Sequence, residues 1–217
     1  MIECPKCSSP VNSESINIQT DIAQCLQCQN IFKISLNIEN LVDPKFNINK
    51  QPSGTWLKKE FNQTIIGATT RSPVAFFLVP FMLIWSGGSL GGIYGSQIID
   101  GEFDLSLSLF GIPFLIGSII FWTITLMAIA GKVEITIDKD GGKVFTGVGQ
   151  LGIIKRFSWD EISKIKEGNS KLTYPGSQGG VIVLEGTRKI SFGLGVKENR
   201  KYYLLNALRS IAKKYQS

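Results

Sequence analysis

The sequence predicts a multidomain membrane protein made of a small β module, a hairpin of two transmembrane helices, and a bent β-sheet domain capped by a C-terminal amphipathic helix. Three observations lead to this fold class. All four cysteines of the 217-residue chain stand in two C-x-x-C pairs before residue 30. Two later stretches are long, apolar and free of charged side chains. After them the sequence alternates apolar and polar residues and ends in a helical repeat.

The two cysteine pairs predict a zinc ribbon. Cys4 and Cys7 frame the sequence CPKC, and Cys25 and Cys28 frame CLQC. Each pair forms a tight turn whose sulfurs converge, and Zn²⁺ prefers four soft ligands in a tetrahedron. The alternative is a pair of redox dithiols or disulfides, but a thioredoxin-like C-x-x-C lies in a βαβ context that this sequence does not have. Four protein ligands close the coordination sphere, so we expect a structural metal, not a catalytic one.

The predicted ribbon covers residues 1–36. A segment of about 35 residues buries too little apolar surface to fold on its own core, so metal ligation must contribute much of its folding free energy. Glycine often follows the second cysteine of such pairs, whereas Ser8 and Gln29 stand there in this chain. We therefore expect local strain or a looser geometry at these turns. Residues 37–54, which are rich in Asn and interrupted by prolines, are predicted to be a linker.

Residues 72–99 and 105–131 are predicted to be transmembrane helices. Neither stretch contains a charged side chain, and each exceeds the roughly 20 apolar residues that cross a bilayer core as a helix. A buried helical hairpin in a soluble protein is the alternative, but a soluble core helix of this length would show a polar face. Because no ionisable residue lies inside either span, the usual mark of an ion or proton pathway is missing, which disfavours a transporter or channel.

The charge distribution predicts that both termini are cytoplasmic. Residues 100–104, with the sequence DGEFD, form a loop that has three acidic residues and no Lys or Arg. The flanks of the two spans are basic instead: Lys58, Lys59, Arg71, Lys132, Lys139 and Lys143. The positive-inside rule then puts the flanks in the cytoplasm and the acidic loop outside. A reducing cytoplasm also keeps the four thiols available to a metal.

Glycines recur at every fourth position of the first span, at Gly87, Gly91 and Gly95. Small residues at this spacing let two helices approach closely in lipid. We expect these glycines to pack against the second span, because that helix is tethered only a few residues away. A homo-oligomer formed through the glycine-rich face of the first span is the alternative.

Residues 132–217 are predicted to form a small, strongly bent sheet of about six strands, which the last helix covers. The apolar residues of that helix fall on one face: Leu204, Leu208, Ile211 and Tyr215. Its basic residues are expected elsewhere on the helix: Lys201, Arg209, Lys213 and Lys214.

Residues 55–70 are predicted to be a juxtamembrane β-hairpin, because strand-forming residues stand on both sides of a two-residue turn. The hairpin either stands alone against the membrane or joins the C-terminal sheet, with the spans inserted between strands. A free two-stranded hairpin is marginal in water and needs something to pack on.

Several segments resemble known bacterial proteins. The step FSWDEISKI, which passes from one strand through Trp159 and an acidic pair into the next strand, and the closing YYLLNALRSI resemble bacterial pleckstrin-homology-like (PH-like) domains. Together with the cysteine pairs, RSPVAFFLVPF, FTGVGQLG and ISFGLG, they are similar to a family of uncharacterised bacterial membrane proteins that carry a zinc ribbon, two spans and such a domain. The resemblance covers nearly the whole chain. It implies a PH-like fold for residues 132–217 and a bacterial cytoplasmic membrane location, but no activity.

The C-terminal domain is the basic part of the protein. Residues 132–217 hold 16 Lys and Arg against 8 Asp and Glu, in a chain of net charge +6. Anionic lipid in the cytoplasmic leaflet attracts such charge with a free energy of about 1 kcal/mol for each well-placed Lys or Arg. The ordinary positive-inside bias accounts for much of the excess. The residues predicted to contact the lipid surface are Lys139, Lys143, Lys155 and Arg156.

The function expected from these features is that of a membrane-anchored scaffold or sensor, which presents the ribbon and the basic domain to a protein partner or to anionic membrane lipids. An enzyme is not expected, because the chain has no histidine and the adjacent Asp160 and Glu161 would face opposite ways on a strand. The alternative is a membrane-tethered nucleic-acid-binding protein acting through the ribbon. Residues 1–36 oppose it, since they carry two bases against three acids and offer no phosphate footprint.

Overall fold

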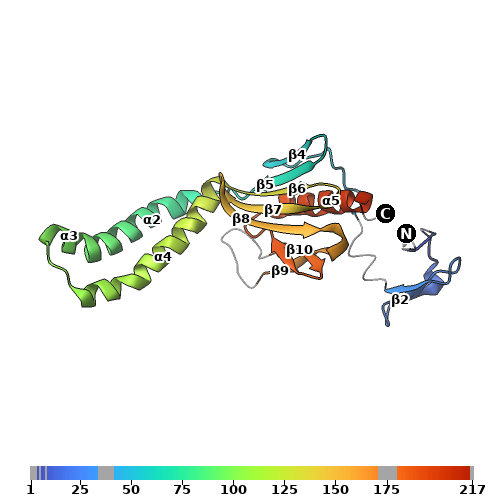
Figure 1. Cartoon of the computed structure of the whole chain (residues 1–217), viewed down its shortest axis with the longest axis horizontal. Helices are drawn as coiled ribbons and strands as arrows, with labels where there is room; N and C mark the ends of the chain where they lie inside the picture. Colours follow the sequence, from blue (N-terminus) through green and yellow to red (C-terminus); the bar gives the residue numbers. More distant parts are fainter. Residues whose placement is uncertain (1–3, 5, 8, 34–41, 171–179, 216–217) are drawn as a thin grey trace.

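The computed structural model describes residues 4, 6–7, 9–33, 42–170 and 180–215. Along this described chain, a small cysteine-bearing sheet comes first, two apolar helices follow between strands of a larger sheet, and a helix comes last (Figure 1). The predicted fold class is confirmed at this level: two apolar helices, several antiparallel sheets and a cluster of four cysteines near the N-terminus.

The N-terminal sheet is antiparallel and its three strands are short: β1 (Ile16–Asn17), β2 (Ile22–Gln24) and β3 (Ile31–Lys33). Very little apolar side chain is buried between them. Among the described residues, the buried cluster consists of Cys4, Val11, Ala23 and Cys25, with a few half-buried neighbours. Two of these four residues are thiols, so hydrocarbon burial alone gives this sheet little stability.

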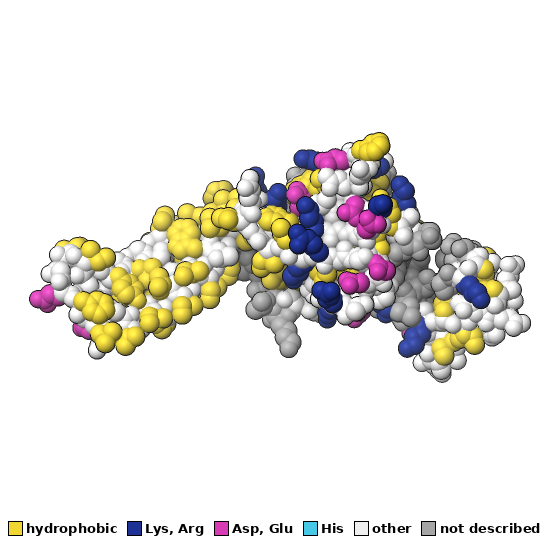
Figure 2. All heavy atoms as spheres, viewed as in Figure 1, with side chains coloured by type: hydrophobic (Ala, Val, Ile, Leu, Met, Phe, Trp, Pro, Cys, Tyr) yellow, Lys and Arg dark blue, Asp and Glu magenta, His cyan; other side chains and the backbone are white. Residues whose placement is uncertain are grey.

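The two apolar helices form a hairpin whose segments are α2 (Ala75–Leu90), the π-helical turn η2 (Gly91–Gly95), α3 (Ser96–Asp100) and α4 (Leu105–Ala130). The run from Ala75 to Asp100 and the helix α4 have 26 residues each, and both are long and apolar enough to cross a membrane. Most of their apolar side chains face outward, which gives the hairpin its yellow surface in Figure 2. The predicted spans, 72–99 and 105–131, differ from these bounds by at most three residues.

The expected packing of the glycine-rich face against the second span is wrong. A side-chain carbon built at Gly87, Gly91 or Gly95 would meet no described atom within 4 Å. The close glycine contact is on the other helix, where Gly111 of α4 lies directly against the ring of Tyr94. At this contact the two helices meet through a large side chain over one glycine, and the three glycines of the first span stay outside it.

The larger sheet is antiparallel, and its strands follow the order β4 (Thr55–Lys59), β5 (Thr64–Thr69), β6 (Gly131–Ile137), β7 (Gly141–Val148) and β8 (Leu151–Ser158). A second antiparallel sheet contains β9 (Ile162–Asn169), β10 (Gly180–Gly186) and β11 (Ile190–Phe192). The last helix is α5 (Glu198–Tyr215). Every second residue of β6 is buried, so Val133, Ile135 and Ile137 point into a core that both sheets and α5 share.

The hairpin predicted at residues 55–70 corresponds to β4 and β5, and it belongs to the larger sheet. β5 pairs with β6 over six residues, from Thr64 opposite Ile137 to Thr69 opposite Lys132. The whole helical hairpin is thus an insertion between two neighbouring strands.

The connection to the helices gives the larger sheet two distinct ends. At the helix-proximal end, Gly131 pairs with Val148, which in turn pairs with Leu151. At the helix-distal end lies the turn between β6 and β7. The seven residues of β6 separate the two ends by about 20 Å.

The helix α5 covers the core with the face predicted from its sequence. Leu204 and Leu208 are fully buried, and Ile211 and Tyr215 pack against the same cluster. Trp159 is a core residue, and its ring stacks on that of Tyr215 at a centroid distance of 6.0 Å.

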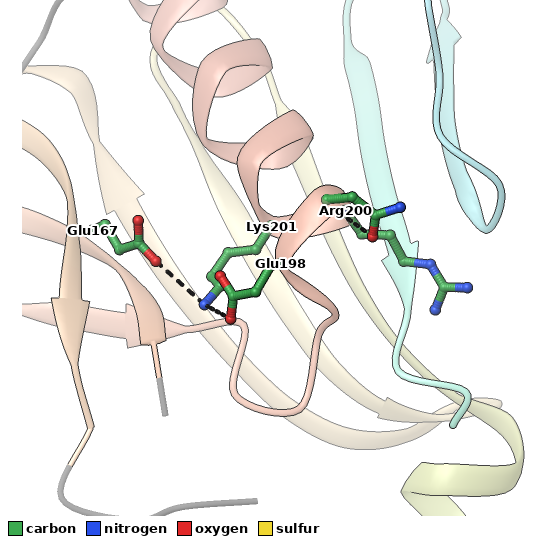
Figure 3. Close-up of polar contacts among 5 residues, drawn as sticks. Glu167, Glu198, Arg200 and Lys201 are labelled. Atoms are coloured by element: carbon green, nitrogen blue, oxygen red, sulfur yellow. Dashed lines mark hydrogen bonds and ion pairs between the residues drawn. The ribbon is translucent and has the colours of Figure 1, made fainter. Parts of the chain in front are cut away.

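The expectation for Lys201 was the polar face of α5, and this is wrong, because its side chain is only 2% exposed. Its Nζ lies 2.7 Å from Oε1 of Glu198 and 3.3 Å from Oε1 of Glu167, as Figure 3 shows. Two half-exposed carboxylates therefore compensate for the desolvation of one buried ammonium group.

The neighbouring Arg200 points to the other side of the helix, toward the base of the helical hairpin (Figure 3). Its guanidinium group donates to three carbonyl oxygens: Ser53 at 2.9 Å, Thr69 at 3.0 Å and Arg71 at 3.3 Å. One side chain of α5 thereby binds the residues before β4, the end of β5 and the segment that leads into α2.

Removing the two carboxylates around Lys201 should destabilise the protein more than removing the Lys201 charge itself. The double change Glu167→Gln and Glu198→Gln leaves a buried charge without its counter-ions, so we expect a loss of about 2–3 kcal/mol in the free energy of unfolding. Lys201→Met removes the charge and keeps the volume, so its loss should stay within about 1 kcal/mol. Chemical denaturation in detergent, followed by tryptophan fluorescence, measures both. The exposed Lys197→Met is the control, and a larger loss for Lys201→Met than for the double change would contradict this account.

Candidate metal centre

Two equivalent turns bring the cysteine pairs together. The N–H of Cys4 donates to the carbonyl oxygen of Ser9 at 2.9 Å, and the N–H of Cys25 donates to that of Asn30 at 2.9 Å. In both turns the first cysteine is bonded to the residue five positions later, so the chain folds around the second cysteine. The Ser9 hydroxyl donates to Oε1 of Gln27 at 3.0 Å and links the turns. Ser9 and Gln27 are not among the residues predicted from the sequence; their position within two residues of a cysteine is the signal that points to them.

The four predicted ligands are brought to one point. All four sulfur atoms lie within 4.8 Å of one another, and the distances Cys4–Cys28 and Cys7–Cys25 are both 3.6 Å. A disulfide would need about 2.05 Å, so these are separate thiols. Metal–sulfur bonds of about 2.3 Å give a tetrahedron with edges of about 3.8 Å, which is close to the observed spacing. The cluster therefore fits one metal ion held by four thiolates.

The thiols influence one another's ionisation. Contacts with the side chain and then the backbone of Ser9 lower the pKa of Cys7 to about 6. Burial raises the pKa of Cys4, but the N–H groups of Lys6 and Cys7 outweigh it, so the net shift is downward. At Cys28 the N–H of Asn30 lowers the pKa, but burial and the other thiols raise it further, to about 12.

These opposed shifts describe a cluster that gives up its first protons readily and its last one with difficulty, because negative charge accumulates on neighbouring sulfurs. A bound dication removes that penalty and stabilises the full set of thiolates. The chemistry of the donor set thus favours an ion at this point.

The expected strain is present at the second turn. Gln29, directly after Cys28, has a φ of +56°, a left-handed conformation that side chains with a Cβ adopt at a cost of about 1–2 kcal/mol. Its N–H donates to the carbonyl oxygen of Cys25 at 2.8 Å, so the turn requires this geometry. The corresponding residue of the first turn, Ser8, lies outside the described residues.

The four residues predicted to contact lipid do not form one surface. Lys139 is in the turn between β6 and β7, at the helix-distal end of the larger sheet. Lys143 and Arg156 are directly opposite each other on β7 and β8. Lys155 faces the other side of the sheet, and its Nζ donates to the carbonyl oxygen of Ser191 at 2.8 Å.

The acidic pair has a different setting from the one expected. Asp160 and Glu161 lie in a single turn of 3-10 helix, not on a strand. Asp160 accepts a hydrogen bond from the hydroxyl of Ser158, which lowers its pKa, and Glu161 lies 3.7 Å from the guanidinium of Arg188. Each carboxylate is engaged by its own partner.

No protein-family model and no curated protein matches the sequence.

The thiol cluster should hold one metal ion per chain. Elemental analysis of the purified full-length protein should find one equivalent, and Cys25→Ser should abolish it, because three remaining thiolates and one hydroxyl bind far more weakly. Ser13→Ala, in the same module but outside the cluster, should keep the metal. Full retention of metal in the Cys25→Ser protein would contradict the assignment.

Gln29→Gly should strengthen the metal centre. Glycine adopts the left-handed conformation without the Cβ penalty, and its extra chain entropy offsets only part of this gain, so we expect up to about 1 kcal/mol of stabilisation. A chelator titration of the metal-loaded protein measures the effect as a higher midpoint. Leu26→Gly, at an exposed position of the same turn without positive φ, should lower the midpoint, and a lower midpoint for Gln29→Gly would show that no strain is relieved there.

Proposed function

We propose that the protein is a membrane-anchored scaffold, which holds a zinc ribbon and a basic PH-like domain at the inner surface of a bacterial cytoplasmic membrane, where the ribbon docks a partner protein. The insertion of the apolar hairpin between β5 and β6 carries this proposal. Thr69 and Lys132 are paired neighbours, so both ends of the helical hairpin start from the same end of one sheet. A two-pass anchor with this connectivity keeps the sheet on one side of the bilayer.

Zinc is the proposed ion because a tetrahedral set of four thiolates is its usual structural site. With four protein ligands no position stays open for water or substrate, so the ion stabilises the module and does not catalyse. Structural zinc contributes about 10–16 kcal/mol of apparent binding free energy in zinc-finger peptides. A contribution of this size suits a module whose apolar core is as small as Val11 and Ala23.

The distribution of charge supports the orientation. Arg71 and Lys132 stand at the two helix ends that adjoin the sheet, and the turn at the other end carries Asp100, Glu102 and Asp104. Under the positive-inside rule, the sheet and both termini are cytoplasmic. The reducing cytoplasm then keeps the thiols free for zinc.

The PH-like assignment of the C-terminal domain is supported by its architecture. Two antiparallel sheets enclose one core, and the amphipathic helix α5 covers it. This agrees with the fold that the sequence resemblance implies, to which the hairpin β4–β5 adds two strands from before the helices.

A protein partner is favoured over nucleic acid by the surface of the ribbon. Among its described residues, four large apolar side chains are exposed: Ile18 (86%), Leu26 (70%), Ile31 (64%) and Ile22 (40%). A protein surface that binds nucleic acid carries clustered Lys and Arg side chains, whereas a surface that docks another protein is centred on exposed apolar side chains. Leu26 lies inside the second cysteine turn, so zinc binding would also fix the position of this side chain.

Cysteine labelling and crosslinking test the proposal. In a chain whose native cysteines are replaced by Ser, Gly101→Cys should react with an impermeant maleimide on intact cells, and Lys214→Cys should react only after permeabilisation. For docking, crosslinking in native membranes should link the wild-type protein to a partner, and the double change Leu26→Ser and Ile31→Ser should remove that product while zinc is retained.

The control for docking is Gln24→Ser, an exposed polar position on the same small sheet, which should keep the crosslinked product. Labelling of position 214 on intact cells would overturn the orientation. A crosslinked product that survives the double change would exclude the apolar ribbon surface as the docking site.

A further inference from the structure

Three large apolar side chains are exposed at the start of β8, although the same sheet buries its other apolar residues efficiently. The exposed fractions are 84% for Leu151, 66% for Ile153 and 53% for Ile154. In the described chain β8 is an edge strand of the larger sheet. Leu151 and Ile153 project from one face and Ile154 from the other, so apolar groups surround this edge. We call these three residues the hairpin tip.

Leu151 lies level with the end of α4, and Ile153 and Ile154 follow two and three residues farther along β8. Gly131 follows α4 directly and pairs with Val148, which pairs with Leu151. Contacts between β7 and α4 hold the hairpin β7–β8 beside that helix. The tip is thus at the helix-proximal end of the sheet.

Helix length indicates what surrounds this level. Twenty-six residues at 1.5 Å each give about 39 Å, whereas the hydrocarbon core of a bilayer is about 30 Å thick. If the hairpin of apolar helices is centred in the bilayer, its ends extend about 4–5 Å beyond the hydrocarbon on each side, into the headgroup layer. Leu151 would lie in the same layer, because it is level with Gly131, the residue that follows α4. Ile153 and Ile154 extend the apolar surface from this level by about 7–10 Å along β8.

Basic side chains at this level complement an anionic surface. Arg71 is exposed, and among the described residues its guanidinium has no hydrogen bond or ion pair. Lys132 stands at the end of α4, with its Nζ 3.5 Å from Glu134 and 5.3 Å from the ring centre of Phe145. In Figure 2, dark blue side chains gather on the part of the sheet domain that adjoins the apolar hairpin.

We propose that the hairpin tip inserts into the headgroup layer of the bilayer, so that phospholipid covers Leu151, Ile153 and Ile154. The inference rests on the proposed membrane anchoring and adds a second point of attachment. Apolar side chains are stable in this layer when basic groups stand beside them. Phospholipid is favoured over a second protein chain as the group that covers these side chains, because they adjoin the helix ends that would already lie in the bilayer. A sheet held at both the helix ends and the tip cannot swing freely about the helix axis.

Site-specific photocrosslinking tests the insertion. The full-length protein, with p-benzoyl-phenylalanine in place of one residue, is reconstituted in nanodiscs of phosphatidylcholine and phosphatidylglycerol, irradiated, and analysed by intact mass spectrometry for phospholipid adducts. Position 151 should give adducts at a yield comparable to position 119 within α4, where Ile119 is 61% exposed. The yield should be several-fold higher than at position 61, because Phe61 is fully exposed at the helix-distal end.

A matched pair of variants tests the role of the apolar side chains. With the photoreactive residue at position 151, the double change Ile153→Asp and Ile154→Asp should lower the adduct yield several-fold, because two buried charges oppose insertion. Lys139→Asp, in the helix-distal turn, should leave the yield unchanged.

The outcomes separate the two proposals. Adducts at position 119 but not at position 151 would overturn the inference and leave the membrane anchoring intact. A lack of adducts at position 119 would overturn the anchoring and the inference with it. Crosslinks from position 151 to a second copy of the chain, without lipid adducts, would replace lipid insertion by edge-to-edge pairing of β8.

Discussion

The pairing of β5 with β6 across the helical hairpin is the constraint on which the rest of the structure depends. The N–H of Thr70 donates to the carbonyl oxygen of Gly131 at 2.9 Å, its hydroxyl to that of Met127 at 2.6 Å, and the N–H of Ser72 to that of Ala128 at 3.0 Å. The ladder therefore continues past the strands, between the segment that leads into α2 and the last turn of α4. Residue 131 must be glycine for this approach, because a Cβ there would meet both Thr70 and Met127.

Because both helix ends are hydrogen-bonded to adjacent strands, the sheet and the helices move as one unit. Arg200 strengthens the joint from the side of α5, since its guanidinium binds carbonyl oxygens before β4, at the end of β5 and ahead of α2. Lys201, one residue later, anchors the same helix to β9 through Glu167. The first turn of α5 thus contacts both sheets and the base of the hairpin. A rotation of the domain relative to the helices would have to break these bonds together, which is why a second attachment at β8 would act on the orientation of the whole domain.

The N-terminal cysteine-bearing sheet depends on a different source of stability from the larger domain. Among the described residues, the larger domain buries 21 in one cluster, whereas the N-terminal sheet buries four, and two of those are cysteines. Apolar burial at about 25 cal/mol per Å² can hold the first unit together but not the second, and ligation of the proposed zinc ion would supply the missing free energy. Its surface can consequently leave apolar side chains such as Leu26 exposed, because the fold does not need them.

The sequence alone determined those features in which the chemistry is local. Thiol spacing identified Cys4, Cys7, Cys25 and Cys28 as one cluster that could hold a metal ion, hydropathy identified the two apolar helices within three residues, and a period of 3.6 found the buried face of α5. Tertiary structure decided the features that depend on pairing between distant segments. It decided that β4–β5 joins the larger sheet, that Lys139 lies far from the two apolar helices, and that Lys201 is buried. Sequence periodicity reports which face of an element is apolar, whereas the partner of that face depends on register and on residues more than thirty positions away, such as Glu167 for Lys201.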